Sequence, residues 1–446
     1  MYEFFQQGFQ KAANQPFQAR RIGAELKFPL VQRQTGEAAS LTTVNHLWQH
    51  LAERNWKVID DPLTHKPVGA RKPGEFNDTI AGYAIGFCNL EFSLAHAGDL
   101  HTLEQQIDSL VADLAPFSDA HDVSFLGHGI QPVTEPTSEY RAPKQRTLFD
   151  WNAIFPREYL FTVSAESHVH LSISSEEGIQ ATNTLNGFAG PQIALMANSS
   201  IWKGKVDETY QSVTEKIYDW WIPDGEQVGI PTNSFKDLAD YARFVDNLSP
   251  VFVYRNEEPI LINHYSSFAD YFGRSQAVGY RLSGEEIEIS PLPEDVKLHN
   301  SFYWFTARIS RYFTIENRLW DQQPPGDLIC PAALSLGLLS ALPEAQEELN
   351  QYNWSTLRLM REAALQKGLE GMVEGIAIAD LAKRMLEIAT LGLKRRGLGE
   401  EKFLDPLEQR LVLRQNPATV ARELFNKGGI TALVGDRDIC RYKAIN

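Results

Sequence analysis

RYFTIENRLWD, residues 311–321, is the stretch that decides the fold. Its apolar and polar residues alternate, and successive side chains of a β-strand point to opposite faces of the sheet. The run therefore predicts a strand with one face buried in a core and one face that carries ionisable groups. The apolar set is Phe313, Ile315 and Leu319, and the opposite set is Thr314, Glu316, Arg318 and Trp320.

Three further runs repeat this pattern: RIGAELKFPL (residues 21–30), GFCNLEFSLA (86–95) and ESHVHLSIS (166–174). Antiparallel sheets often leave one face to water, so a solvated surface is one interpretation of the polar sets. The gathering of Glu, His and Arg on four strands favours a metal–phosphate site instead, because facing carboxylates need a compensating cation. The polar sets are Gly23, Glu25 and Lys27; Asn89, Glu91 and Ser93; and His168, His170, Ser172 and Ser174.

The pair His168-x-His170 offers an alternative, since two histidines on one strand face could bind zinc. No third ligand at a recognisable spacing accompanies them in the sequence. Hydrogen bonding is therefore the favoured interpretation of this pair.

The composition is that of an acidic globular protein of 446 residues, 43% hydrophobic and 22% charged, with ample material for a core. A formal net charge of −15 speaks against nucleic acid or an anionic membrane as partners. It allows a nucleotide, because bound Mg²⁺ can bridge acidic side chains and phosphates.

Three cysteines, Cys88, Cys330 and Cys440, occur without CxxC or other metal spacing, which favours a reducing compartment over a disulfide scaffold. The first residues contain no long apolar segment of the kind found in secretory signals. The longest apolar run, residues 331–342, is too short to span a bilayer. We expect a cytoplasmic protein that does not bind membranes.

The pattern along the chain predicts an α+β fold with two regions. Residues 1–345 mix alternating runs with helical stretches and form the expected catalytic region, in which residues 61–77 look like a long loop. Residues 346–446 carry apolar residues at three- and four-residue spacing, which predicts a helical C-terminal region packed on the first.

In these motifs the sequence resembles the glutamate–cysteine ligases, especially the plant-type and related bacterial carboxylate–amine ligases. The resemblance covers roughly residues 20–345. The motifs occur in the order RIGAELKF, CNLEFS with DLHTLEQQI, FLGHGIQP, HVHLSIS, GPQIALMANSSIWKGK, PVFVYRN and RYFTIENRLWDQQPPGDLICPAALSLGLL.

The resemblance implies a glutamine-synthetase-like fold, a curved antiparallel sheet with helices outside it. It also implies an ATP-dependent ligase that phosphorylates a carboxylate and lets an amine attack the acyl phosphate, giving a γ-glutamyl-type amide. The implied partners are small molecules, namely ATP, Mg²⁺, a carboxylate and an amine. These residue types suit that chemistry, since carboxylates hold magnesium and Arg stabilises a migrating phosphoryl group.

Carried onto this sequence, the resemblance assigns roles to seven residues, and the charge of Lys27, Arg274 and Lys216 suggests roles for three more. Glu25, Glu91 and Glu316 are the implied magnesium ligands, and His170 is a further ligand or a nucleotide phosphate contact. Arg318 is the phosphate clamp, and Arg318, Glu316 and Lys27 form the catalytic set. Lys203 is assigned to nucleotide binding, and Trp202, Arg274 and Lys216 to substrate binding.

Three positions depart from the family pattern. Lys27 stands where a second glutamate is expected, so one magnesium position is lost or replaced. Ala84 stands where an acidic residue is expected, and Asp78 is the nearest upstream carboxylate. Thr214 stands where an arginine would grip the glutamate carboxylate, with only Lys216 nearby. An alternative is therefore a catalytically degenerate relative that binds a nucleotide or a partner without ligation.

Overall fold

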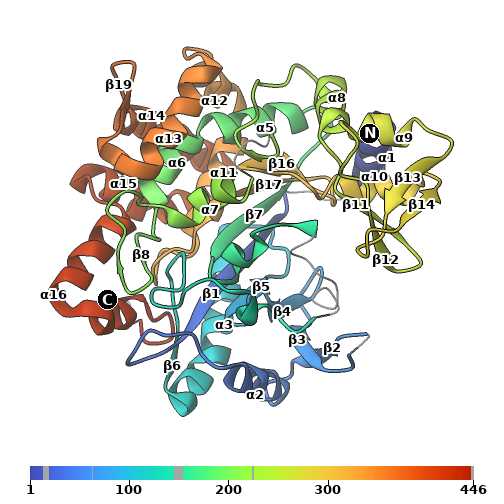
Figure 1. The fold of residues 1–446 in the computed structure, drawn as a ribbon. Coiled ribbons are helices and arrows are strands. Elements are labelled where there is room, and N and C mark those ends of the chain that lie inside the picture. The colour runs from blue at the N-terminus through green and yellow to red at the C-terminus, as the bar shows by residue number, and fades with distance from the viewer. Residues whose placement is uncertain (14–19, 63, 145–153, 223–225, 443–446) are drawn as a thin grey trace.

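A nine-stranded antiparallel sheet forms the centre of the computed structural model, which describes residues 1–13, 20–62, 64–144, 154–222 and 226–442 (Figure 1). Eight strands lie in the order β16-β17-β7-β1-β5-β4-β3-β2, and β6 pairs with β1. The strands are β1 (Ile22–Gln32), β2 (Lys57–Asp60), β3 (Pro67–Lys72), β4 (Thr79–Tyr83), β5 (Asn89–Ser93), β6 (Val123–Phe125), β7 (Glu166–Ser172), β16 (Ala307–Ile309) and β17 (Thr314–Asp321).

The four runs with alternating residues become β1, β5, β7 and β17, and they are neighbours in the sheet. Their register brings the polar residues of the four strands onto one face. The prediction of a loop over residues 61–77 is wrong in part, because residues 67–72 pair with both β2 and β4. The cross-strand pairs on the polar face include Lys27 with Glu91, Glu25 with His168, and His170 with Glu316.

A β-bulge interrupts the alternation in β17. Arg318 and Leu319 together oppose the single residue His168 of β7, and pairing resumes at Trp320 with Ser167. The extra residue turns Trp320 to the apolar face, where its side chain is buried in the core. The prediction that Trp320 shares the polar face is therefore wrong.

Helices cover the apolar face of the sheet. Asn317, on the apolar face of β17, donates hydrogen bonds to Gln192 of α6 and Ser335 of α11, which fixes these helices beneath the strand. The helix α11 is apolar all round and almost wholly buried, as a helix enclosed by other elements must be. The helices of this layer are α2 (Leu41–Ala52), α3 (Leu100–His121), α5 (Gly178–Gly187), α6 (Ala189–Met196) and α11 (Cys330–Ser340).

The C-terminal region is helical, as predicted, and forms the orange and red part of Figure 1. Most of its buried hydrophobic residues belong to the same cluster as those of the sheet, which runs from Ile22 to Ile439, while Ala421, Leu433 and Val434 belong to two smaller clusters. The predicted division of the chain into residues 1–345 and 346–446 stays a prediction, because one hydrophobic core includes residues on both sides of it. The helices are α12 (Leu342–Leu349), α13 (Trp354–Lys367), α14 (Ile378–Arg396), α15 (Asp405–Leu413) and α16 (Pro417–Arg437).

A smaller antiparallel sheet, drawn in yellow in Figure 1, lies to one side of the central sheet. It has its own hydrophobic cluster, against which Met1 and Phe4 from the N-terminus pack. We call this part the small lobe. Its elements are β11 (Phe252–Arg255), β12 (Glu258–Leu261), α9 (Phe268–Phe272), β13 (Ala277–Tyr280), β14 (Glu286–Ile289) and α10 (Pro293–His299).

The remaining elements are short or connect these parts. The sequence of residues 1–20 also predicts an N-terminal helix, of which residues 14–19 lie outside the described residues. The connecting helices are α1 (Tyr2–Ala13), α7 (Val213–Trp221) and α8 (Leu238–Asn247). Three short strand pairs are β8 (Ile201–Trp202) with β9 (Lys205–Val206), β10 (Val228–Gly229) with β15 (Trp304–Phe305), and β18 (Met372–Val373) with β19 (Ile376–Ala377). The 3₁₀ turns are Ser138–Tyr140, Glu158–Thr162, Gly368–Glu370 and Glu400–Leu404.

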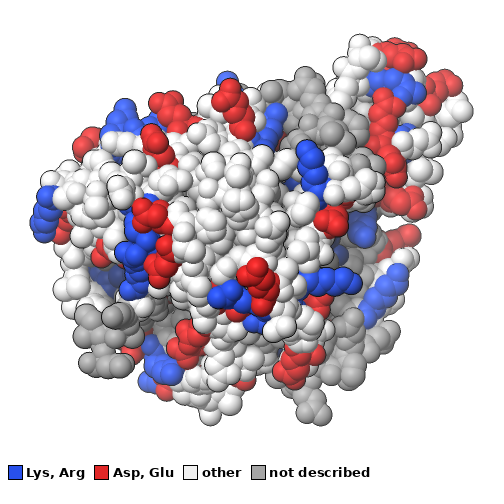
Figure 2. All heavy atoms as spheres, turned by 90° about the horizontal axis from the view of Figure 1, so that it is seen from below, with Lys and Arg blue, Asp and Glu red and all other residues white. Residues whose placement is uncertain are grey.

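Acidic and basic side chains lie interspersed on the surface seen from below, separated by wide uncharged areas (Figure 2). Within the described residues, every helix is too short or too polar to cross a membrane.

Candidate active site

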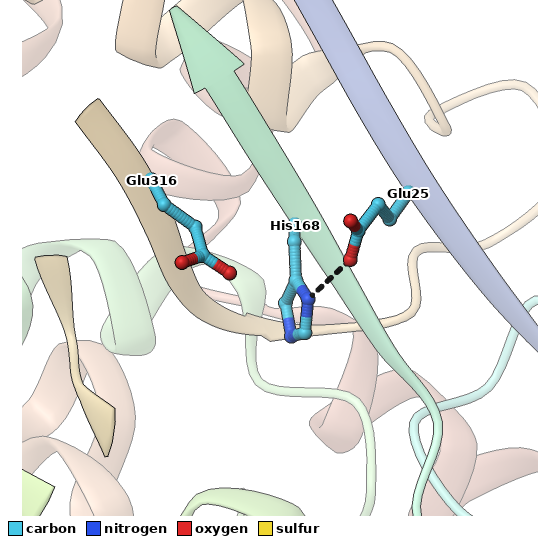
Figure 3. Close-up of side chains that lie close together, drawn as sticks. All are labelled: Glu25, His168 and Glu316. Atoms are coloured by element: carbon cyan, nitrogen blue, oxygen red, sulfur yellow. Dashed lines mark hydrogen bonds and ion pairs between the residues drawn. The ribbon is translucent and has the colours of Figure 1, made fainter. Parts of the chain in front are cut away.

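Glu25, His168 and Glu316 approach one another on the polar face, from the adjacent strands β1, β7 and β17 (Figure 3). One ligand atom of each lies within 4.8 Å of the others, and this is the group of metal-ligating side chains found among the described residues. Alternation puts each side chain on the face. The register places Glu25 opposite His168 and Glu316 opposite His170, the next residue of β7 on this face, so Glu316 is a diagonal neighbour of His168.

The protonation of His168 suits a metal ligand. Burial lowers the pKa of His168 to about 4, helped by the nearby charges of Lys27 and Arg318, so the imidazole is neutral. Its Nδ1 lies 3.0 Å from Glu25 Oε2, which assigns the proton to Nδ1. Its buried Nε2 has no hydrogen-bond partner among the described residues and keeps a free lone pair. A carboxylate that orients a histidine in this way is typical of metal sites.

His170 has a different environment. Its Nδ1 lies 3.0 Å from Thr314 Oγ1, and its Nε2 lies 3.5 Å from Glu25 and 3.8 Å from Glu316. Burial lowers the pKa of His170, but the two carboxylates outweigh burial and leave that pKa raised. The geometry favours His168 over His170 as the nitrogen ligand, and the role given to His170 stays a prediction.

Glu316 is held by two guanidinium groups. Arg308 Nε donates to one of its oxygens at 2.7 Å, and Arg318 Nη1 donates to the other. Burial would raise the pKa of Glu316, but the two arginines and His170 hold it well below its usual range. Glu316 is therefore a permanent anion in a cationic setting.

A second group of charges surrounds Lys27. Its ammonium lies 2.6 Å from Glu166 and 3.7 Å from Glu91, on the strands either side of β1. Burial opposes the charge on Lys27 and on Glu166, yet their attraction raises the pKa of Lys27 and lowers that of Glu166 to about 2. Burial, reinforced by the charge of Glu25, raises the pKa of Glu91.

The role of Glu166 was missed in reading the sequence, although the signal was present. Glu166 begins the run ESHVHLSIS, and alternation puts it on the same face as His168 and His170.

A cavity of about 810 Å³ opens beside these charges, between the central sheet and the small lobe. Lys27, Glu166 and Arg318 form one charged end, Glu158, Glu257 and Arg311 also line the cavity, and aromatic residues are the largest group in its wall. A largely apolar cavity with a few converging charged groups is the usual form of a small-molecule site. The aromatic wall consists of Phe155, Phe161, Tyr218, Trp221, Phe252, Tyr254, Phe302 and Trp304.

Trp202 and Lys203 lie outside the residues that line this cavity. The Trp202 indole donates to Asp207 at 3.1 Å and stacks on Trp220, and the Lys203 ammonium lies 4.3 Å from the centre of the Trp202 ring. Their binding roles stay predictions.

Lys216 and Arg274 also lie outside the cavity lining. Lys216 pairs with Asp219 at 3.0 Å and with Glu362 at 3.5 Å. Arg274 is 48% exposed on the small lobe and pairs with Asp270. The structure does not bring either cation to Glu25 and Glu316, and their substrate-binding roles stay predictions.

The departures from the family pattern have visible structural consequences. Ala84 lines the cavity without adding charge, and Asp78 pairs with Arg71 on the neighbouring strand. Thr214 is fully buried at the start of α7, where its hydroxyl donates to the Gly129 carbonyl at 2.6 Å. Thr214 therefore fills a structural position and offers no charge to a substrate carboxylate.

The residues present fit one divalent cation better than two. The Glu25, His168 and Glu316 group provides two carboxylates and an imidazole whose ligand atoms lie within 4.8 Å of one another. At Glu91 and Glu166, by contrast, the Lys27 ammonium already lies between the oxygens.

Comparison with known proteins identifies the family and the fold. The sequence model of glutamate–cysteine ligase family 2 (GCS2) matches residues 22–436. A chloroplastic glutamate–cysteine ligase A of Oryza sativa subsp. indica is 26% identical over 75% of this chain and 68% of its own length. A Streptomyces avermitilis protein, provisionally named as glutamate–cysteine ligase 2-1, is 25% identical over 92% of this chain and 96% of its own.

Solved structures extend the likeness to the fold. The glutamate–cysteine ligase of Francisella tularensis, in complex with AMP, aligns with a TM-score of 0.52 at 12% identity over 95% of this chain and 90% of its own. A bifunctional glutathione synthetase of Pasteurella multocida aligns with the same score at 13% identity, over 95% of this chain and 51% of its own. The predicted family, the glutamine-synthetase-like fold and the class of enzyme, an ATP-dependent carbon–nitrogen ligase, are thereby confirmed. The chain belongs to glutamate–cysteine ligase family 2.

Proposed function

We propose that the protein joins a carboxylate to an amine through an acyl phosphate, using ATP and Mg²⁺ at the polar face of the central sheet. The observation that carries the proposal is the convergence of Glu25, His168 and Glu316 beside Arg318, which pairs with Glu316 and lines the cavity. A cation that can bind an anion, a group of potential metal ligands and a cavity for the substrates are the parts that phosphoryl transfer needs.

The proposed reaction has two steps. A carboxylate oxygen of the first substrate attacks the γ-phosphorus of ATP, and ADP leaves. The amine nitrogen of the second substrate then attacks the acyl carbon, the bond to phosphate breaks, and the nitrogen loses a proton. The products are an amide, ADP and phosphate.

Arg318 and Lys27 are the cations best situated to hold the transferred group, because both line the cavity. The carboxylates beside them, Glu316 and Glu166, keep these side chains in fixed positions, so little reorganisation is needed when an anion binds. A bound divalent ion would be held by Glu25, His168 and Glu316 and would neutralise phosphate charge.

Glutamate and cysteine are the proposed substrates, because the named relatives are glutamate–cysteine ligases. Two features of the structure are reasons to test other pairs of carboxylate and amine substrates as well. Thr214 offers no charge for a substrate carboxylate, and the aromatic wall of the cavity would accept a side chain larger than that of cysteine. We also propose a cytoplasmic location, from the sparse and unpaired cysteines.

The test is ADP release with Mg²⁺ across a panel of amino-acid pairs that includes glutamate with cysteine. We expect release only when both a carboxylate and an amine are present. Glu316→Gln should lose turnover and remain folded, while Glu288→Gln, which changes an exposed carboxylate on β14, should keep it. Full activity in Glu316→Gln would refute the assignment of the site.

A non-catalytic nucleotide-binding relative is the second candidate. It is favoured by Glu316, whose two oxygens are both engaged by arginines and so are partly withdrawn from a metal. This candidate predicts that ATP binds, measured by calorimetry, while no substrate pair releases ADP.

A further inference from the structure

Two carboxylates of the polar face converge on a lysine instead of on open space. Glu91 on β5 and Glu166 on β7 flank β1, and Lys27 Nζ lies between them, 3.7 Å from one and 2.6 Å from the other. The side chains of Lys27 and Glu166 are 11% and 3% exposed, so water contributes little to the charge balance of this pair, whereas Glu91 is 33% exposed and water reaches it.

Paired, poorly solvated carboxylates repel one another unless a cation lies between them. Convergent carboxylates are also how proteins bind divalent ions. An independent sign of binding capacity is Glu166 Oε1, which is buried and has no hydrogen-bond partner among the described residues, although Glu166 lines the cavity. The group thus has the ligands of a cation site, and a side chain supplies the cation.

We propose that the Lys27 ammonium is a resident cation that replaces a second divalent ion. The protein then binds one divalent ion, at Glu25, His168 and Glu316, and removal of Lys27 opens a second ion position between Glu91 and Glu166. This inference deepens the proposed function, since it states how many metal ions that site uses.

The replacement has a consequence for the site. A tethered ammonium carries one positive charge and cannot dissociate, whereas a free divalent ion carries two charges and exchanges with solvent. Lys27 and Arg318 both line the cavity, so these two fixed cations remain available to a phosphate when free metal is scarce.

The test counts bound Mn²⁺ by electron paramagnetic resonance, without nucleotide, in the full-length protein. We expect one ion in the wild type, two in Lys27→Met, and one again in the double variant Lys27→Met/Glu166→Gln. Lys72→Met is the matched control, because Lys72 also pairs with a carboxylate, Asp113 at 2.7 Å, but lies outside the site. It should leave the count at one.

Lys27→Met also leaves two carboxylates without their cation and can therefore lower stability. Thermal unfolding measured at increasing Mn²⁺ concentration tests the proposal even if Lys27→Met is less stable, because an ion that binds the folded state raises the melting temperature. The rise should be larger for Lys27→Met than for the wild type.

Two bound ions in the wild type would overturn the proposal. So would an unchanged count in Lys27→Met, or a Lys27→Met protein that stays unfolded at saturating Mn²⁺. Since none of these measurements uses ATP or amino acids, they are independent of whether the ligase reaction itself is found.

Discussion

Asp321→Asn should stabilise the protein at neutral pH, although it removes a hydrogen-bonded buried carboxylate. Asp321 ends β17 and is 2% exposed. One oxygen accepts from the Asn198 backbone N–H at 2.5 Å and the Ser199 hydroxyl at 2.8 Å, and the other from the Ser212 hydroxyl at 3.2 Å. An asparagine can keep all three contacts, because its amide N–H can donate to Ser212, whose oxygen can accept.

The magnitude follows from the proton that Asp321 retains. Burial outweighs the three hydrogen bonds and raises the pKa of Asp321 from 3.8 to about 7. Between these values the folded protein holds a proton that the unfolded chain has released, so the free energy of unfolding falls as pH rises. The slope is about 1.4 kcal/mol per pH unit, and the full loss above pH 7 is about 4 kcal/mol. Asparagine has no proton to release and avoids this loss.

Urea unfolding of wild type and Asp321→Asn at pH 6 and pH 8 measures the effect. We expect the variant to be the more stable protein at both, and its advantage to grow by about 1.4 kcal/mol between them. Asp108→Asn, at an exposed position of α3, should give a difference that does not change with pH. An advantage that is the same at pH 6 and pH 8, or a less stable Asp321→Asn at pH 8, would refute the reasoning.

Three further variants test the packing, the buried threonine and the phosphate clamp. Gly392→Ala should lower the free energy of unfolding by about 1–3 kcal/mol, because the added Cβ would collide with the Gly337 carbonyl oxygen where α14 packs on α11. The melting temperature should fall accordingly, and an unchanged thermal scan would contradict this. Thr214→Arg should lower the stability of the protein and give no gain in affinity for glutamate, measured by calorimetry. The Thr214 side chain is fully buried and its hydroxyl donates to the Gly129 carbonyl, so an arginine side chain does not fit there. A stable variant that binds glutamate more tightly would contradict this. Arg318→Lys should keep the fold by circular dichroism but slow ADP release at least about tenfold, because an ammonium lacks the planar fork of donors; wild-type turnover would rule out a clamp.

Local sequence determined much of the polar face. Alternation alone assigned Glu25, Glu91, His170 and Glu316 to one surface, because the side-chain period of a strand is fixed by its backbone. The same rule failed at Trp320, since a bulge is set by pairing with the neighbouring strand and leaves no mark in the composition of the run.

What only the tertiary structure decided is which of these groups touch. The sequence by itself determined the family, the antiparallel sheet, the helical C-terminal region and the set of ionisable residues on the polar face. Register then paired His168 with Glu25 and brought Glu166 to Lys27, while the position of the small lobe created the aromatic cavity. Contacts at sequence separations above 100 residues depend on strand order and layer packing, which short-range patterns do not encode.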